Sequence, residues 1–409
     1  MTSVDATSTA STANPSPAPV SAAPGDLLQL LLDGVPRTRA ELAQLTGLAR
    51  STIAVRVEAL MDSGLVAAVG EAASSGGRPP SRFAFNPGAR VVLAIDLGAM
   101  HAVVALTDLA GRVLVRRRTD LSIASGPHTV LDAVVAEAHD LLASQQLSTD
   151  DLAGVGIGLP GPVEHTSGRP ANPPIMPGWH DFDVPAYIRE SFDVTVLVDN
   201  DVNLMALGEQ RMHWPSQENL LFIKVSTGIG AGIIGNGQLQ RGALGTAGDL
   251  GHVRVGRGGD VICRCGNVGC LEALAGAPAI AAGLGLTAGG SGDVVRLVEA
   301  GDAATIAALR QAGRDLGEVL ATCVSLLNPS VIVLGGALSA AGDHVLAGAR
   351  EVVYSRSLPL ATARLTIARA ASSDDAGVIG ASMMVTQHVL SAGVVDVLLA
   401  PRGRERATA

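Results

Sequence analysis

Three cysteines and one histidine form the densest group of metal-binding side chains in the chain. Cys263, Cys265 and Cys270 fall within eight residues, and His252 lies eleven residues before the first of them. Three thiolates and one imidazole are a suitable ligand set for a closed, tetrahedral, structural zinc site. Free structural thiols are the alternative, but this density of cysteines beside a histidine disfavours it. We therefore predict a zinc loop over residues 252–272.

A second group of reactive side chains is the motif Asp199-Asn200-Asp201, which directly follows the apolar segment VTVLV. If that segment is a strand, Asp201 lies at its carboxyl end, where open α/β sheets place their ligands. A carboxylate there can accept a proton from a sugar hydroxyl, so Asp201 is the candidate general base of a phosphoryl transfer. Alternatively, Asp201 caps the helix that follows, and one residue can serve both purposes.

Three glycine-containing segments follow predicted strands and have the backbone freedom that phosphate loops need. The first segment, Asp-Leu-Gly at 96–98, places a carboxylate beside backbone amides that could contact phosphate or its metal. The second, STGIG at 226–230, adds hydroxyl groups. The third, the glycine pair after VIVL, would let an adenosine lie flat against the chain. Each one alone is also compatible with an ordinary glycine turn. The nucleotide-binding residues that this pattern predicts are Asp96, Gly98, Thr227, Gly228, Gly335 and Gly336.

The N-terminal part of the chain has the pattern of three short helices followed by a β-ribbon. We expect helices over residues 26–33, 38–47 and about 51–63, and strands over 65–70 and 81–85. Thr38, with Glu41 three residues later, predicts a capping box at the start of the second helix. This order is typical of a winged helix-turn-helix. The alternative is a helical subdomain that packs against another surface.

If this part binds DNA, its third helix would enter the major groove, and the wing segment GGRPPSR would reach a narrow minor groove. The predicted DNA contacts are Arg50, Ser51, Thr52, Arg56, Arg78 and Arg82. A net charge of −9 for the whole chain would argue against nucleic acid, because phosphate binding needs clustered Lys and Arg. Residues 26–90, however, carry seven Arg and only six acidic residues, so the excess acidity lies elsewhere.

Composition and patterning divide the chain further. Residues 1–24 are rich in Ser, Thr, Ala and Pro and predict a disordered tail before the head at 25–88. Strands and helices alternate over 89–395, which predicts helices on both faces of a mixed sheet in two lobes, and 396–409 are expected to fray. No apolar run approaches the roughly 18 residues of a membrane helix, and the N-terminus has no signal-peptide pattern. We expect a cytoplasmic protein without a membrane partner.

Five motifs together resemble the ROK family, which groups repressors, uncharacterised open reading frames and sugar kinases. The motifs are GLPGP at 158–162, DND at 199–201, STGIGAG at 226–232, GDLGH at 248–252 and CRCGNVGCLE at 263–272. The resemblance extends from about residue 26 to residue 390 and includes repressors of the xylose and N-acetylglucosamine type. It implies an α/β protein with an N-terminal winged helix-turn-helix followed by a two-lobed actin-like, hexokinase-like (ribonuclease H-like) ATPase fold.

The resemblance also implies partners and a sugar site. The partners would be a double-stranded DNA operator, a monosaccharide or sugar-phosphate effector, and further copies of the chain in a homodimer or homotetramer. The histidine of the family is thought to touch both sugar and zinc. The substrate-binding residues implied are Gly161, Asn172, Asn200, Asp201, Asp249, His252 and Glu272.

Two departures from the family pattern bear on function. Where the kinases have Asp-x-Gly-Gly-Thr, this chain has Ala99-Met100 after Gly98, and a thioether cannot donate a hydrogen bond to phosphate. This change disfavours binding of ATP and Mg²⁺. The family's Glu before x-Gly-His is here Asp249, one methylene shorter, so its sugar contact is expected to be lost, bridged by water or directed at a different sugar.

Three functions are compatible with these residues. The leading hypothesis is a transcription regulator, a repressor of sugar uptake or metabolism genes that releases its operator when sugar closes the two lobes. The alternative is an ATP-dependent hexose or N-acetylhexosamine kinase with an N-terminal extension, which Asp201 favours and Met100 opposes. A metal-sensing regulator is the third hypothesis, although closed four-ligand sites usually hold zinc permanently.

Overall fold

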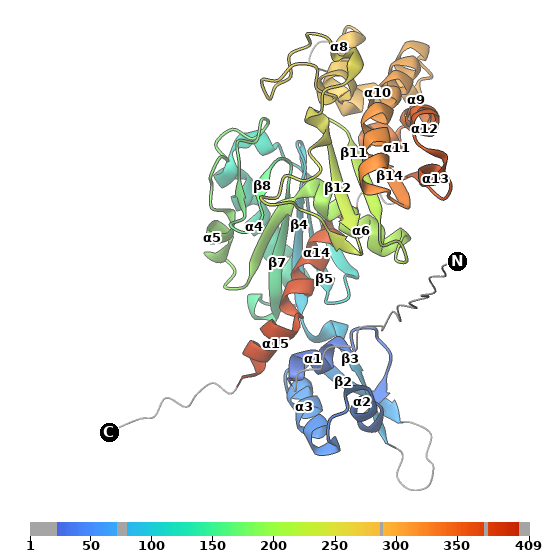
Figure 1. Cartoon of the computed structure of the whole chain (residues 1–409). Coiled ribbons are helices and arrows are strands. Elements are labelled where there is room, and N and C mark those ends of the chain that lie inside the picture. Colours follow the sequence, from blue (N-terminus) through green and yellow to red (C-terminus); the bar gives the residue numbers. More distant parts are fainter. Residues whose placement is uncertain (1–22, 72–79, 287–288, 372–374, 401–409) are drawn as a thin grey trace, which may run out of the picture. The chain divides into compact units, whose positions relative to one another are not determined.

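The computed structural model describes residues 23–71, 80–286, 289–371 and 375–400. The predicted contact Arg78 and residues 1–22 of the predicted tail lie outside the described residues. The chain divides into two compact units (Figure 1). One unit consists of the residues up to Asn86 together with those from Leu390 onward, and the other is Pro87–Val389.

The first unit contains the three predicted helices and the two predicted strands in the predicted order, together with two elements that were not predicted, β1 and α15. Its elements are α1 (Pro24–Gln29), β1 (Arg37–Thr38), α2 (Arg39–Thr46), α3 (Arg50–Asp62), β2 (Val66–Glu71), β3 (Ser81–Phe85) and α15 (Ala392–Leu399). The strands form an antiparallel sheet in the order β1-β3-β2. The capping box at α2 is confirmed, because Thr38 and Glu41 exchange side-chain and backbone hydrogen bonds. Leu28, Leu42 and Ile53 are fully buried and join the helices.

Helix α15, from the C-terminal end of the chain, packs against α1 within this unit. The Gly25 amide donates a hydrogen bond to Asp396 Oδ1 at 2.7 Å, and Gln29 Nε2 donates to the Leu390 carbonyl at 2.7 Å. A Cβ atom on Gly25 would lie 2.2 Å from the Ala392 carbonyl oxygen, so only glycine allows this approach. The expectation of a frayed tail over 396–409 therefore does not hold for 396–399, which are helical.

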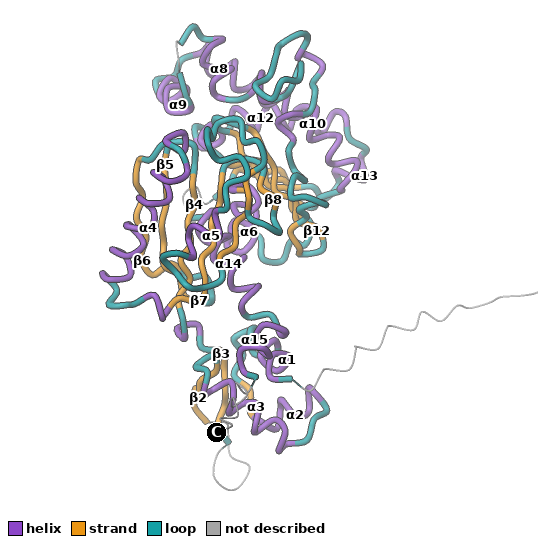
Figure 2. Tube along the Cα trace, turned by 90° about the vertical axis from the view of Figure 1, so that its left-hand side faces the viewer, coloured by secondary structure: helices purple, strands orange, loops and turns teal. Residues whose placement is uncertain are grey.

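The second unit contains two lobes, each built on a five-stranded sheet (Figure 2). The first sheet has the order β10-β7-β4-β5-β6, with β4, β7 and β10 parallel and β5 and β6 antiparallel. Its strands are β4 (Val91–Leu97), β5 (His101–Asp108), β6 (Val113–Asp120), β7 (Leu152–Leu159) and β10 (Val196–Asn200). Helices α4 (Pro127–Ser144) and α5 (Val184–Arg189) pack on one face. A small ribbon, β8 (Val163–Glu164) with β9 (Arg169–Pro170), lies beside β10.

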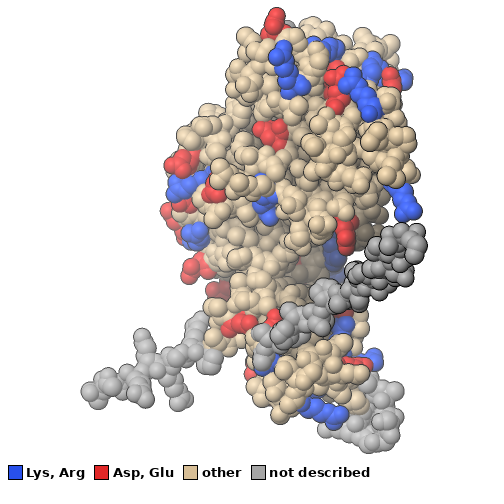
Figure 3. Space-filling model, in the orientation of Figure 1, with Lys and Arg blue, Asp and Glu red and all other residues tan. Residues whose placement is uncertain are grey.

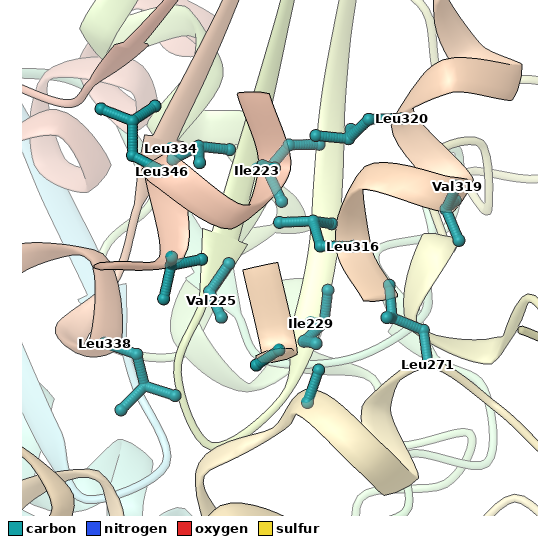
Figure 4. Close-up of a cluster of buried hydrophobic side chains, with 14 of the residues drawn as sticks. Ile223, Val225, Ile229, Leu271, Leu316, Val319, Leu320, Leu334, Leu338 and Leu346 are labelled. Carbon is teal, nitrogen blue, oxygen red and sulfur yellow. The ribbon is translucent and has the colours of Figure 1, made fainter. Parts of the chain in front are cut away.

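The second sheet has the order β13-β12-β11-β14-β15, and its centre is the strand β11 (Leu220–Val225). The other strands are β12 (Ile229–Gly235), β13 (Gln238–Leu239), β14 (Val331–Gly335) and β15 (Thr366–Arg369). The helices of this lobe are α7 (Glu272–Ala275), α8 (Ala277–Gly283), α9 (Ser291–Glu299), α10 (Ala303–Leu327), α11 (Ala337–Ala340), α12 (His344–Arg356) and α13 (Pro359–Thr362). Figure 4 shows the core, where Ile223 and Ile229 of the sheet lie near Leu316 and Leu320 of α10.

Two helices connect the lobes through a shared core. Helices α6 (Asp201–His213) and α14 (Ala376–Val389) pack against each other. Their buried side chains join a cluster with Ala94 and Ala105 of the first sheet and Phe222 and Val333 of the second. This arrangement confirms the predicted mixed α/β fold with two lobes. Among the described residues no single helix is long and apolar enough to cross a membrane; the broken pair α14 and α15 meets that test only by combined length and composition.

Candidate functional site

A cavity of about 680 Å³ lies between the two lobes of the second unit. Its walls come from the strand ends of both sheets and from the loops that follow them. All seven residues implied for sugar binding line this one cavity: Gly161, Asn172, Asn200, Asp201, Asp249, His252 and Glu272. They are spread over more than one hundred residues of sequence, so the fold brings a scattered polar set to one place.

Asn200 connects the floor of the cavity to the start of α6. Its Oδ1 accepts hydrogen bonds from the Val202 and Asn203 amides, so Asn200 is the N-cap of α6. Its Nδ2 donates to the Gly161 carbonyl at 2.9 Å. The alternative interpretation of Asp201 as the cap is therefore wrong: Asp201 is the first helical residue, and its carboxylate is directed to the other lobe.

Asp201 pairs with a lysine that the sequence analysis did not identify. Its Oδ2 lies 2.5 Å from Lys224 Nζ on β11, and its Oδ1 accepts from the Val202 amide at 2.8 Å. Asp201 is 3% exposed, and Lys224 also lines the cavity. Burial opposes the charge on Lys224, but attraction to Asp201 and Asp96 outweighs it, so the pKa of Lys224 is raised and the ammonium form persists.

A buried ion pair behind Asn200 also went unnoticed in the sequence. Asp199 is 1% exposed, and its Oδ2 accepts from Arg241 Nε at 2.6 Å while its Oδ1 accepts from Asn203 Nδ2 at 2.8 Å. Arg241 precedes the loop that carries Asp249, so the pair holds this wall of the cavity in place. His165 Nδ1 lies 3.7 Å from Asp199, and burial and the charge of Arg241 lower the pKa of His165.

Glu272 joins the cavity wall to the predicted phosphate loop. Its Oε2 accepts a hydrogen bond from the Ile229 amide at 3.0 Å and would lie 2.8 Å from a Cβ on Gly228. Thr227 and Gly228 line the cavity. A nearby hydroxyl, Ser291 Oγ, lies 3.4 Å from Thr227 Oγ1.

The other predicted nucleotide contacts are not among the cavity's lining residues. Gly335 fits against the Phe222 ring and Gly336 against the Val225 backbone, so packing alone requires these two glycines. Gly98 likewise fits against the His101 ring. Met100, which stands where the kinases have a hydroxyl, lines the cavity and is 66% exposed.

The predicted zinc ligands are close enough together to hold one ion. The ligand atoms of His252, Cys263, Cys265 and Cys270 all lie within 4.8 Å of one another. Cys265 and Cys270 sulfurs are 3.8 Å apart, and Cys263 Sγ is 3.6 Å from His252 Nδ1. Both distances match those between neighbouring ligands around a tetrahedral zinc ion, whose bonds are about 2.3 Å to sulfur and about 2.0 Å to nitrogen. The four thiols of the chain, including Cys323, form no disulfide.

The group of four predicted zinc ligands adjoins the cavity. His252 Nε2 lies 3.9 Å from Asp249 Oδ1, on the opposite edge of the ring from the cysteines, and His252 and Cys265 both line the cavity. Burial raises the pKa of Cys263 and Cys270, that of Cys270 to about 12. A bound cation would displace those protons, because thiolates are the form that binds metal.

Helix α3 of the first unit presents the predicted DNA contacts on one side. Ile53, Val57 and Leu60 are buried. Arg50 and Ser51 are exposed, and Thr52 and Arg56 are half-buried. Val55, which the sequence analysis passed over, is 67% exposed between them. Figure 3 shows that charges of both signs are interspersed over the visible face rather than gathered in one large patch.

Arg82 lies on β3 rather than at the tip of the ribbon. It is opposite Thr38 of β1 in the sheet, and its charge contributes to the lowered pKa of Glu41, after the hydrogen bonds from Thr38. The structure therefore places Arg82 beside the start of α2, near the first residues of the helix-turn-helix.

The fold and site define a class of protein in which a winged helix-turn-helix head is joined to a two-lobed domain with a polar interlobe pocket. The sequence profile of the ROK family matches residues 92–388, and a winged helix-turn-helix DNA-binding profile matches residues 25–67. The chain belongs to the ROK family, as its motifs predicted.

Two of the known relatives match about nine tenths of this chain, and a third matches 73% of it. A xylose repressor of Bacillus spizizenii is 31% identical over 89% of this chain and 94% of its own length. A solved ROK-family transcriptional regulator, homologous to the Escherichia coli MLC protein, has a TM-score of 0.77 and 25% identity over 92% of this chain and 98% of its own. A ROK hexokinase from Thermus thermophilus, with a TM-score of 0.60 and 28% identity, covers 73% of this chain and 99% of its own. The hexokinase-like fold is thereby confirmed for the two-lobed unit.

Proposed function

We propose that this chain is a sugar-responsive transcription regulator, a repressor that binds operator DNA through its head and releases it when a monosaccharide or sugar phosphate fills the interlobe cavity. One observation carries the proposal. The same chain combines helix α3, whose accessible side chains include hydrogen-bond donors, with a cavity that is lined by all seven residues implied for sugar binding. A relative that matches over 94% of its own length is a xylose repressor, and a solved neighbour that matches over 98% of its own length is a ROK-family transcriptional regulator. Operators lie in the cytoplasm, which is where we place the protein.

In this proposal the cavity binds the sugar by hydrogen bonds from both lobes. Asn200 and Asp201 belong to the first lobe, and Asp249, His252 and Glu272 belong to the second, the last of them at the start of α7. Hydroxyls that bridge the two sets would favour the closed form, since a ligand shifts an equilibrium by its differential affinity for the two states. Two heads bound to adjacent half-sites require a homodimer or homotetramer, which light scattering on the purified protein would establish.

The test is operator binding by fluorescence anisotropy after a thermal-shift screen of monosaccharides and their phosphates. We expect one compound to raise the melting temperature and to weaken operator binding. Asp249→Ala should lose both responses and keep its operator affinity. Asp193→Ala removes the same charge at an exposed position outside the cavity and should behave as wild type. Absence of sequence-selective DNA binding under all conditions would refute the proposal.

A sugar kinase remains the second candidate function, because the hexokinase relative shares the two-lobed unit and Asp201, the candidate base, lines the interlobe cavity. Met100 and the DNA-binding head oppose it. Sugar-dependent release of ADP from the purified protein, abolished by Asp201→Asn, would reverse the order of the two candidates.

A structural zinc ion at the His252 cluster is part of the same proposal. The ion would tie the loop over residues 252–272 and fix the His252 ring with Nδ1 toward the cysteines and Nε2 toward Asp249. A closed four-ligand site holds zinc permanently, which disfavours the metal-sensing hypothesis. Elemental analysis should find one zinc per chain, lost in Cys270→Ser and retained in Cys323→Ser, which removes a buried thiol from α10. Zinc-dependent, reversible operator binding would support metal sensing instead.

A further inference from the structure

Two aspartates of the first lobe border one gap, the space left by the absent side chain of Gly158. Asp96 lies at the end of β4 and Asp201 directly follows β10, and β7 runs between these two parallel strands. Gly158 of β7 leaves the gap open: a Cβ there would lie 3.4 Å from Asp96 Oδ1 and 3.5 Å from the Asp201 Cα. A larger residue at Gly158 would therefore disturb both the Asp96 carboxylate and the backbone at the start of α6.

Lys224 approaches Asp201 from the other lobe. It lies on the central strand β11, paired with Gly230 of β12 on one side and Gly335 of β14 on the other, so its backbone is fixed by both neighbours. Its Nζ lies 2.5 Å from Asp201 Oδ2, and the field of Asp96 also stabilises its charge. The side chain is 22% exposed and lines the cavity.

A pair of strand-end carboxylates beside a phosphate-type loop is the kind of site that holds Mg²⁺ for a nucleotide, since Mg²⁺ binds through one or two carboxylates and phosphate oxygens. We propose that the Lys224 ammonium is a resident cation that takes the place of a divalent metal between Asp96 and Asp201, so that the cavity binds its effector without a metal and rejects a metal–nucleotide. A divalent ion would have to displace an ammonium that is already hydrogen-bonded, and would meet its repulsion.

This inference deepens the proposed function, because it explains how a kinase-like cavity serves binding without phosphoryl transfer. Both oxygens of Asp201 already accept hydrogen bonds, from Lys224 and from the Val202 amide. The candidate base is thus occupied before any sugar arrives. Met100, on the turn between β4 and β5, also lines the cavity, and its thioether cannot donate a hydrogen bond to phosphate.

The test uses the full-length, zinc-loaded protein and Mn²⁺, whose binding to oxygen ligands is followed by electron paramagnetic resonance. We expect no Mn²⁺ site at the cavity in wild type or in Lys224→Arg, which keeps the cation. Lys224→Gln should gain one site per chain, which binds Mn²⁺ at least about tenfold more tightly than any residual binding of Mn²⁺ by wild type. The gain should vanish in Lys224→Gln/Asp201→Asn. Arg211→Gln, which removes one charge from an exposed position on α6, should gain nothing.

Two outcomes would overturn the inference. One is a folded Lys224→Gln protein without a new Mn²⁺ site, with Lys224→Thr as the substitute if the first variant does not fold. The other is a wild-type Mn²⁺ site that Asp201→Asn abolishes, a measurement that needs no Lys224 variant. Operator binding is measured on the same preparations, so that a failure of DNA recognition is seen separately from the metal result.

Discussion

At the scale of single residues, the recognition helix exposes one large apolar side chain among polar ones. Val55 is 67% exposed on the side of α3 that carries Arg50 and Ser51. In the major groove an apolar side chain distinguishes thymine by its C5-methyl group. We therefore expect Val55 to contact a thymine methyl in each operator half-site.

Val55→Ala should weaken operator binding by about 1 kcal/mol, the lower end of what one base contact contributes. Replacing the contacted thymine by uracil should cost wild type the same amount and cost the variant nothing further, which anisotropy with substituted duplexes can measure. Val261→Ala, an equal truncation of an exposed valine in the other unit, serves as control. Equal losses from uracil in wild type and Val55→Ala would contradict the contact.

His165 gives a pH dependence with a definite sign. Burial, then the charge of Arg241, lowers its folded pKa despite the opposing attraction of Asp199 and Glu164. The unfolded chain therefore binds the proton more readily, and stability falls as the pH drops below about 6.5, the ordinary pKa of histidine. His165→Gln should reduce the fall in melting temperature between pH 7.5 and 5.5 measured by calorimetry. An unchanged slope would show that other groups cause it.

The sequence could predict residues whose chemistry is local in the chain, and it missed those defined by a partner far away. The cysteine cluster and the Asn200-Asp201 pair are recognisable from their spacing, and the structure brings each set together. Lys224 and Arg241 look like ordinary surface charges in sequence. Their partners lie 23 and 42 residues away and on other elements, so only the folded sheets show the ion pairs.

At the scale of elements, the N-terminal helices and strands lie within a few residues of their predicted positions, because capping and hydrophobic spacing are local signals. The strand over 81–85 agrees with its prediction, and the capping box fixes the start of α2. Helix α15 was missed, because its place is set by α1, more than 360 residues earlier in the chain. Its short apolar segment carries no sequence sign of that partner.

The docking of α15 is open to a steric test. Gly25→Ala puts a methyl group 2.2 Å from the Ala392 carbonyl, and such overpacking typically costs about 1–3 kcal/mol. We expect the amides of α15 to exchange faster with deuterium and the head to melt earlier. Gly393→Ala adds the same methyl within α15, where nothing lies within 4 Å, and should leave exchange unchanged or slower. Unaltered exchange in Gly25→Ala would mean that the helices separate without cost.

At the scale of the whole molecule, two covalent connections join the units, at Asn86–Pro87 and at Val389–Leu390. The second follows α14, which packs against the carboxyl end of β4: a Cβ on Gly377 would meet Asp96 Oδ2 at 2.4 Å. The same helix leads through Leu390 and Ser391 to α15, which holds α1 of the head. Under the proposed function, we expect this continuous segment to transmit a change at the cavity to the head.

Insertion of two glycines between Leu390 and Ser391 should therefore uncouple the sites while leaving each intact. Operator affinity without sugar and sugar affinity without operator should stay as in wild type, but the factor by which sugar weakens operator binding should approach one. Linkage requires the operator to weaken sugar binding by the same factor, so calorimetric titration of sugar with and without DNA checks the result independently. If the coupling factor survives the insertion in both titrations, the connection at Pro87 transmits the signal instead.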